Sequence, residues 1–322
     1  MRIFRAILRK VFQLLIVAFL VNSATFFLTS LIPGDFFTPL EGNPNISLDT
    51  VRRLREQYGL AEPTYLQYVH WLARGARFDL GYSLFYGDSV ASVVSSALAN
   101  TLRIGIPALI IGLLAGSFLG TLHALHQDRP LGYFLDVCSA IILSLPSLIL
   151  GVAALLLAAG THWFPVGGIT SSEFANADVF TRLADQLHHL ALPVLCLGLP
   201  LTATVERIQY SAARITLQGL HLRAARSRGL SSGRIFFKHL MLPSLNPVVS
   251  TAGPVMGLVL SGSLVIEMIF SWPGLGKTTY DALFNLDIFL LLGCVSCGSL
   301  LLVAGNLSAD LLLQMIDPRT RT

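Results

Sequence analysis

Six stretches of this chain are apolar over the length needed to cross a lipid bilayer. A transmembrane α-helix needs about 20 mostly apolar residues. The stretches cover residues 11–32, 101–122, 133–159, 190–210, 248–270 and 288–315. Only 12% of the 322 residues are charged, about half the ~25% typical of soluble domains. We therefore predict an all-α, polytopic integral membrane protein with six transmembrane helices, which excludes intrinsic disorder and an ordinary soluble enzyme.

The first stretch follows four basic residues, an arrangement shared by secretory signal peptides and by retained membrane helices. A signal peptide has an apolar core of about 7–15 residues followed by a small-x-small cleavage site. Here the apolar run occupies residues 11–32, and no such cleavage site follows it. Residues 1–32 are therefore predicted to form a retained N-terminal transmembrane helix.

The distribution of Lys and Arg predicts the orientation in the membrane. Of the 22 basic residues, 14 fall on one side of the predicted spans and 8 on the other. Short loops rich in Lys and Arg stay in the cytoplasm, so both termini are predicted to be cytoplasmic. Residues 33–100 then form an extracytoplasmic segment with an amphipathic helix over 48–58. Residues 101–315 form a five-helix core, and residues 316–322 form a cytoplasmic tail.

The loop 211–247 holds six basic residues and is predicted to fold as helix, turn and helix. Gly229 is placed to end the first helix, and Ser231 or Ser232 to cap the second. The small-residue face of the first helix comprises Leu222, Ala224 and Ala225. The second helix has an apolar side, opposite Arg234 and Lys238, made of Ile235, Phe236, Phe237 and Leu240. Binding of anionic lipid would explain the charge alone, so this pattern favours a docking surface for a soluble protein.

The same loop resembles the cytoplasmic EAA loop of permeases from ABC importers, specifically the dipeptide/oligopeptide/nickel transport family. In that pattern Glu-Ala-Ala is followed, after three residues, by Gly, and the peptide branch often has Arg in the first position. Here Arg223-Ala224-Ala225 precedes Gly229 at that spacing, and His239 also stands where that branch places it.

Further motifs typical of this family occur in order along the chain, and Pro243 is additional to the family pattern. They lie at residues 33–35 (Pro-Gly-Asp), 58–63, 79–83, 100–102, 266–276 and 306–319. The resemblance implies the fold of a type I ABC-importer permease, the inner-membrane subunit of such an importer.

The resemblance also implies partners and a role for the loop 211–247, which we call the coupling loop. It implies a second homologous permease subunit, two ATPase subunits that bind ATP and Mg²⁺, and an extracytoplasmic solute-binding protein. The substrate would be a di- or oligopeptide, with nickel chelates or another small solute as the alternative, and the location the bacterial cytoplasmic (inner) membrane. The implied ATPase-coupling residues are Arg223, Ala224, Ala225, Gly229, Ser231, Arg234, Phe236, Phe237 and His239.

The motif around residues 267–276 is predicted to form an outer gate or vestibule. Its residues are Glu267, Trp272, Pro273, Gly274 and Gly276. Glu267 could attract a substrate amine, or it could bond the backbone of the following turn, and Trp272 is expected at the membrane interface. Residues 271–278 lack one glycine of a P-loop and follow an apolar span, so ATP binding by this chain is not expected.

Two other classes of function compete with an importer subunit. A secondary transporter would carry coupling acids near the midplane, whereas the four intramembrane acids lie near predicted span ends: Asp136, Glu206, Glu267 and Asp310. An intramembrane enzyme would need a catalytic group, and neither a G-x-S-x-G nor an H-E-x-x-H motif occurs. We therefore expect no catalytic, cofactor, metal or nucleic-acid site in this chain. Glycines such as Gly112, Gly116 and Gly120 are expected to let helices slide closely past one another.

Overall fold

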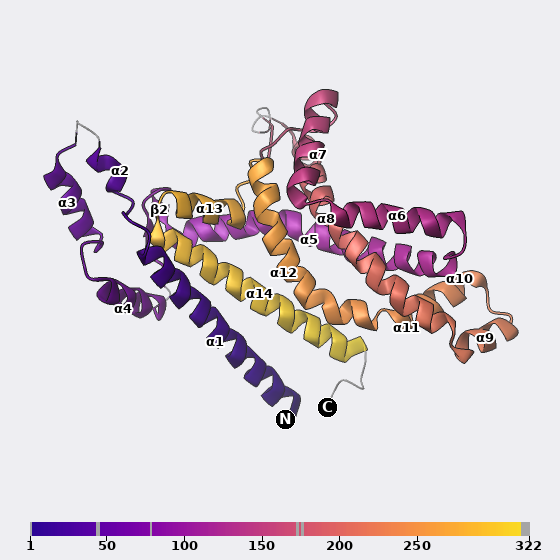
Figure 1. The fold of residues 1–322 in the computed structure, drawn as a ribbon. Coiled ribbons are helices and arrows are strands. Elements are labelled where there is room, and N and C mark those ends of the chain that lie inside the picture. Colours follow the sequence, from indigo (N-terminus) through magenta and orange to yellow (C-terminus); the bar gives the residue numbers. More distant parts are fainter. Residues whose placement is uncertain (1, 43–45, 78, 172–173, 175–176, 317–322) are drawn as a thin grey trace. The chain divides into compact units, whose positions relative to one another are not determined.

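The computed structural model describes residues 2–42, 46–77, 79–171, 174 and 177–316, and the described chain is mostly helical (Figure 1). The predicted all-α class is confirmed. The helices of the first part are α1 (Arg2–Ser30), α2 (Thr38–Glu41), α3 (Leu48–Gln57), α4 (Thr64–Gly75) and α5 (Val90–Leu125). Between α4 and α5, strands β1 (Tyr82–Ser83) and β2 (Asp88–Ser89) form a short antiparallel hairpin.

The second part of the chain continues with long helices joined by short ones. These are α6 (Pro130–Ser144), α7 (Ser147–Thr161), α8 (Val179–Leu217), α9 (Leu220–Ser227), α10 (Ser232–Arg234), the π-helix η2 (Ile235–Met241), α11 (Leu242–Ser244), α12 (Asn246–Ile269), α13 (Leu275–Phe284) and α14 (Ile288–Ile316). The chain divides into two compact units, the first made of residues 1–100 and 274–303 and the second of residues 101–273 and 304–322.

Within the described residues, four helices are long and apolar enough to cross a membrane: α1, α5, α8 and α14. A fifth span results if α6 and α7 form one bent span, but they meet at 101°. Leu145 between them is extended, because a residue before a proline avoids the helical conformation and Pro146 follows. The fifth predicted stretch is the 24-residue helix α12. A multi-pass membrane protein is thus confirmed, whereas six spans and the placement of the termini stay predictions.

Two predicted spans differ in length from the helices that contain them. The stretch 190–210 lies inside the 39-residue α8, which begins at Val179 after Asp178, whose carboxylate accepts the N–H of Phe180. The stretch 101–122 lies inside α5, which begins eleven residues earlier at Val90. Hydropathy missed these extensions because polar residues outside a bilayer continue a helix as long as its backbone hydrogen bonds continue.

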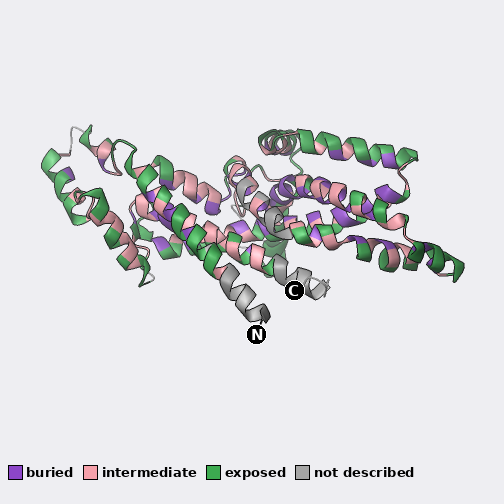
Figure 2. Ribbon diagram, turned by 60° about the horizontal axis from the view of Figure 1, so that its bottom comes forward, coloured by how far each residue is buried: buried purple, intermediate pink, exposed green. Residues whose placement is uncertain are grey.

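Helix α8 is the centre of the second unit. Of the apolar segment of this helix, 56% is buried. It packs against α6, α7, α12 and η2. The main core of this unit joins residues of α5, α7, α8 and α12: Ile104, Ala158, Leu192, Leu197, Ile266 and Phe270 are among its members. Helices carry buried residues on one side and exposed ones on the other, as Figure 2 shows.

Three glycines, Gly112, Gly116 and Gly120, form a seam along which α5 packs directly on α8. A Cβ atom on Gly116 would lie 2.7 Å from Thr202 O, and one on Gly120 would lie 2.4 Å from Glu206 O. Such contacts leave no room for any side chain, so the two helices pack backbone to backbone. The expectation that these glycines let the helices slide is not supported at this seam, because polar side chains on both sides of it bond the two helices together, as described below.

The first unit holds the short helices of the predicted extracytoplasmic segment. Tyr68 and Trp71 of α4 pack on Phe26 of α1, with ring centroids 5.2 and 6.2 Å from that of Phe26. The predicted amphipathic helix over 48–58 is present as α3, capped by Ser47, whose hydroxyl accepts the N–H of Thr50. A second core lies between the start of α5 and the residues of α13 and α14.

Candidate functional site

The coupling loop folds as two short helical parts connected by a glycine turn, as the sequence predicts. Helix α9 ends at Ser227, and Gly229 follows with φ +72°, the left-handed conformation that favours glycine. Leu222 and Ala225 are buried, but Ala224 is exposed, so the predicted face of three residues is wrong in one member. The spacing of Leu222 and Ala225, three residues apart, leaves Ala224 on the other side of the helix.

The second helical part is a π-helix over residues 235–241, which the sequence did not predict. Ser231 stands at the N-cap of α10 but makes no side-chain capping bond there. Pro243 has no N–H group to offer the carbonyl of His239, which lies four residues earlier. The ring of His221 in α9 supplies a donor, with Nε2 3.2 Å from His239 O. The hydrogen bond from His221 to His239 O therefore ties the two helical parts of the coupling loop together.

The two phenylalanines of this segment contact each other edge to face, with ring centroids 4.9 Å apart, but they differ in burial. The ring of Phe236 packs on Phe118 of α5, with centroids 5.6 Å apart, and is half-buried. Phe237 is 53% exposed. Leu240, predicted on the same apolar side as Phe237, is instead buried with Leu222 in a small core of its own.

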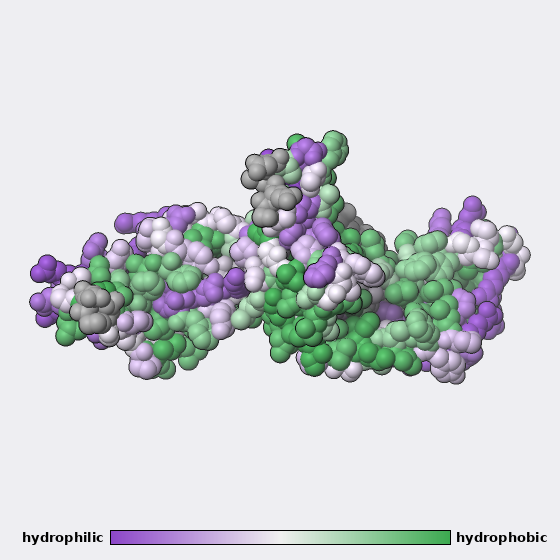
Figure 3. All heavy atoms as spheres, turned by 90° about the horizontal axis from the view of Figure 1, so that it is seen from above, coloured by the Kyte–Doolittle hydropathy of each residue, from purple (hydrophilic) through white to green (hydrophobic). Residues whose placement is uncertain are grey.

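The exposed residues of the coupling loop form the surface available to a partner. Hydrophilic side chains gather at the end of the second unit that carries α9 and α10, next to a broad apolar surface (Figure 3). The exposed members of the predicted coupling set are Arg223, Ala224, Gly229, Ser231, Arg234 and Phe237. Ala225 is buried, and Phe236 and His239 are half-buried, so these three support the surface from below. An apolar cavity of about 210 Å³ lies beside it, lined by α9, η2 and the ends of α5 and α8.

A buried polar cluster lies nearby, between α5, α6 and α8. Glu206 is 1% exposed. Its carboxylate oxygens lie 2.6 Å from His123 Nδ1 and 2.8 Å from Ser139 Oγ. Arg207 extends the cluster by an ion pair with Asp136 at 2.7 Å. The partners of Glu206 come from other helices and enclose its carboxylate.

The outer turn also differs from its prediction. Trp272 is 1% exposed and belongs to the main core of the second unit, so its ring is not an exposed anchor. The backbone N–H of Trp272 donates to the backbone carbonyl of Glu267 at 2.7 Å, and this hydrogen bond closes the turn. The Glu267 carboxylate is fully buried and accepts a hydrogen bond from Thr101 Oγ1 at 2.6 Å. Within this chain, Glu267 thus joins α12 to α5 and does not face an open vestibule.

The remaining residues of the predicted outer gate follow this turn. Pro273 is exposed, Gly274 is buried and Gly276 is half-buried. Gly274 is the N-cap of α13, and the segment follows helix α12, whereas a P-loop follows a strand.

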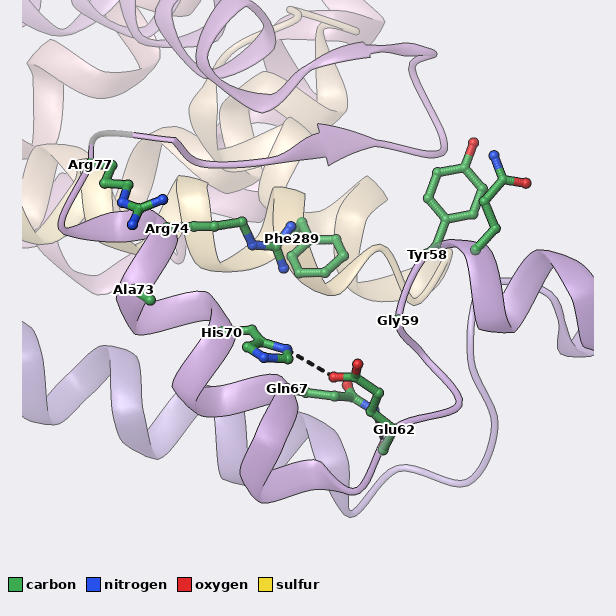
Figure 4. A pocket seen from close by; sticks show the side chains of 10 residues that line it. Tyr58, Gly59, Glu62, Gln67, His70, Ala73, Arg74, Arg77 and Phe289 are labelled. Carbon is green, nitrogen blue, oxygen red and sulfur yellow. Dashed lines mark hydrogen bonds and ion pairs between the residues drawn. The ribbon is translucent and has the colours of Figure 1, made fainter.

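A separate cavity of about 440 Å³ lies in the first unit, between α4, the segment after α3 and Phe289 (Figure 4). The guanidinium of Arg74 stacks over the Phe289 ring at 4.6 Å. One turn earlier on α4, His70 Nδ1 lies 2.9 Å from a carboxylate oxygen of Glu62, which precedes this helix. Arg77 also lines the cavity, and in the described part of the chain neither arginine has a carboxylate within ion-pair distance. The sequence did not single out these residues.

Comparison with known families agrees with this arrangement. Residues 95–322 match the family described as binding-protein-dependent transport system inner membrane component. The chain belongs to this family. Residues 3–104 match the corresponding N-terminal model, described as binding-protein-dependent transport system membrane component, N-term.

Several proteins resemble this permease over nearly their whole length. It is 32% identical over 301 residues to the oligopeptide transport system permease protein AppB of Bacillus subtilis, and the alignment covers 93% of each chain. It is 30% identical over 317 residues to the oligopeptide transport system permease protein OppB of Haemophilus influenzae, and this alignment covers 98% of each chain. A putative peptide permease protein of Brucella suis is 30% identical and covers 92% of each. The resemblance drawn from the motifs is thereby confirmed.

Proposed function

We propose that this permease is a membrane-spanning subunit of an ATP-binding-cassette importer that carries di- or oligopeptides. The observation that carries the proposal is similarity over 93% and 98% of the chain to two permeases named for oligopeptide transport. The importer would contain a second homologous permease, two ATPase subunits and an extracytoplasmic solute-binding protein. It would reside in the bacterial cytoplasmic membrane, with both termini in the cytoplasm.

In this proposal the permease is not itself an enzyme, and ATP and Mg²⁺ bind to the partner ATPases. The coupling loop receives those ATPases through its exposed residues. Phe237 is the aromatic anchor, since a large exposed aromatic ring next to basic side chains is typical of an interface hot spot. Arg223 and Arg234 flank it with charge that favours an acidic groove. Gly229 fixes the turn that holds the two helical parts at their mutual angle.

The outer turn plays a supporting role in the same proposal. Glu267, Trp272, Pro273, Gly274 and Gly276 shape the outer end of the pathway by fixing how α12 ends and α13 begins. Because Glu267 is buried against Thr101, it acts by holding α12 to α5 at this end and not by contacting substrate.

Copurification tests the docking role. Tagged permease with Phe237→Asp should lose the ATPase subunits, because truncating a hot-spot residue costs about 2 kcal/mol or more, roughly thirtyfold in affinity. The matched control is Phe284→Asp, at an aromatic residue that is 68% exposed on α13. Retention of both ATPases at wild-type stoichiometry by Phe237→Asp would disprove docking at this surface.

The substrate class has its own test. Mass spectrometry of the ligand bound to the cognate solute-binding protein should find peptides. A nickel chelate or another small solute in its place would keep the importer assignment and overturn the peptide. Transport by the purified permease without ATPases would instead identify a secondary transporter.

A further inference from the structure

The side chain of Gln209 is fully buried where α8 meets the end of the coupling loop. It is 0% exposed. Its amide nitrogen lies 3.0 Å from Thr121 Oγ1 on α5 and 2.8 Å from Ser244 Oγ on α11. Met241 O, at the end of η2, lies 3.4 Å from the same nitrogen. One amide group thus joins two long helices and the segment through which the coupling loop returns to the membrane.

The hydroxyl partners fix the direction of these bonds. Thr121 Oγ1 donates its hydrogen to Ser117 O at 2.8 Å, and Ser244 Oγ donates to Leu240 O at 2.8 Å. Both hydroxyls therefore accept, and they take the two hydrogens of the Gln209 amide. The arrangement uses both amide hydrogens in defined directions, so it holds α5, α8 and α11 in one relative position.

At this junction, α5 cannot move independently of α8. Gly120 lies next to Thr121, and a Cβ atom on Gly120 would lie 2.8 Å from the Cβ atom of Gln209 itself. The seam and the amide therefore bind α5 and α8 into one body at this level. A displacement of α11 must either break the bonds to Gln209 or move α5 and α8 together.

The other contacts between the coupling loop and α8 are mostly apolar. Leu222 and Leu240 pack on Ala213 and Ala124 in a small core. Apolar packing is non-directional, so it holds the loop on α8 without fixing the direction of a movement. Next to this core, η2 is a π-helix, a geometry found often at functional sites. The junction at Gln209 is the directional link between this segment and the long helices.

We propose that Gln209 is a positioning residue that transmits displacement of the coupling loop to the α5–α8 pair. The proposal rests on the proposed function, in which ATPase subunits move the coupling loop. It assigns Gln209 to the conversion of ATP hydrolysis into transport and not to ATPase docking, because Gln209 is buried and cannot touch a partner.

The test uses the assembled importer with its solute-binding protein, reconstituted in liposomes with a tripeptide as substrate. Gln209→Leu keeps a side chain of similar size and removes every amide bond. We expect the ATPases to copurify at wild-type stoichiometry, while peptide transported per ATP hydrolysed falls about fivefold or more, the lower end of typical coupling effects. Thr204→Val is the matched control on α8, since within the described residues Thr204 Oγ1 bonds only Pro200 O of its own helix.

Milder variants keep the test decisive if Gln209→Leu folds poorly. Thr121→Val and Ser244→Ala each remove one acceptor of the amide, and each should lower the same ratio by less. Since both act through Gln209, Thr121→Val should lower the ratio no further in the Gln209→Leu background.

Three results would overturn the proposal. They are an unchanged ratio of transport to hydrolysis in Gln209→Leu, a fall equal to that of Thr204→Val, and additive effects of Thr121→Val and Gln209→Leu. A wild-type complex that fails to bind ATPases would instead refute the proposed function, so the two failures are distinguishable.

Discussion

His123 on α5 and Glu206 on α8 are 83 residues apart in the sequence, and their side chains meet at 2.6 Å between Nδ1 and Oε1. Both are nearly fully buried, at 4% and 1% exposure. The ring of Tyr210 stacks on His123 with centroids 4.0 Å apart. Within the described residues this pair, with the Gln209 junction three positions further along α8, joins the helices that carry the coupling loop to the rest of the second unit.

This pair gives the first prediction. Removing one partner of a buried hydrogen bond leaves the other group unsatisfied and costs about 1–3 kcal/mol, whereas replacing both partners with apolar groups of similar shape can be nearly neutral. His123→Leu should therefore lower the thermal unfolding temperature of the detergent-solubilised permease clearly. The double variant His123→Leu/Glu206→Leu should recover much of the loss. A double variant as unstable as the sum of its single variants would show that the two groups act independently.

The glycine seam gives a second prediction, in which the effect of a Gly→Ala substitution on the unfolding temperature changes sign with position. In an open helix Gly→Ala stabilises by about 1 kcal/mol. Gly120→Ala would place its methyl group 2.4 Å from Glu206 O and should lower the unfolding temperature. Gly298→Ala on α14 is the control, because no atom lies within 4 Å of its added methyl group. Equal effects of the two substitutions on the unfolding temperature would contradict direct backbone packing of α5 on α8.

The turn of the coupling loop gives a third prediction, which distinguishes the cost of a left-handed backbone conformation from the cost of a steric clash. Neither Gly229 nor Gly233 has an atom within 4 Å of an added Cβ, but only Gly229 has a positive φ, +72°. The left-handed conformation costs a non-glycine residue about 1–2 kcal/mol. Gly229→Ala should therefore reduce ATPase copurification, while Gly233→Ala should leave it at the wild-type level. Amide hydrogen exchange of residues 220–241 would reveal the loosened turn directly.

Asp35 and Arg55 give a prediction on pH in the predicted extracytoplasmic segment. Arg55 Nε lies 2.6 Å from Asp35 Oδ2, and Arg55 also pairs with Glu41. Burial disfavours the charged Asp35 carboxyl, but hydrogen bonds from Arg55 and Thr38 outweigh burial and lower its pKa below the ordinary 3.8. Because the folded pKa lies below the unfolded one, this stabilisation is complete above about pH 4 and is lost as pH falls through the folded pKa.

Amide hydrogen exchange of residues 35–41, corrected for the intrinsic pH dependence, measures this effect. In the wild type, protection should stay constant above about pH 4 and fall below it, as the pH passes through the lowered pKa of Asp35. Asp35→Asn should show weak protection throughout. Asp49→Asn, at an exposed carboxyl in the first turn of α3, should keep the wild-type profile. A wild-type profile in Asp35→Asn would mean that the pair does not stabilise this segment.

Local features of the fold followed from the sequence where the cause was local. Apolar runs predicted the long helices, and their residue types alone require a lipid environment. Gly229 marked the end of α9, because a left-handed residue is chosen by its own backbone. The start of the amphipathic helix at residue 48 was recognisable from its pattern, and Ser47 caps it as a serine at that position does.

One missed feature had a local cause that hydropathy does not register, since Pro146 divides a predicted span into two helices at 101°. Other features depended on groups brought from far along the chain. Trp272 looked like an interfacial anchor, but the packing of α7, α8 and α12 encloses it. The π-helix η2 also escaped prediction, since its residues are ordinary helix formers and its His239 carbonyl is bonded by His221 of α9.

The sequence by itself determined that this chain is a membrane protein. It also determined which family motifs the chain carries and which loop presents a basic, aromatic surface. Hydropathy and turn chemistry act over a few residues, so they can be read in order along the chain. Only the tertiary structure decided that Glu206 and Gln209 are buried junctions, and that Phe236 packs on Phe118 while Phe237 is exposed. Their partners, such as Thr121, come from other helices, and close packing at the glycine seam decides which of them meet.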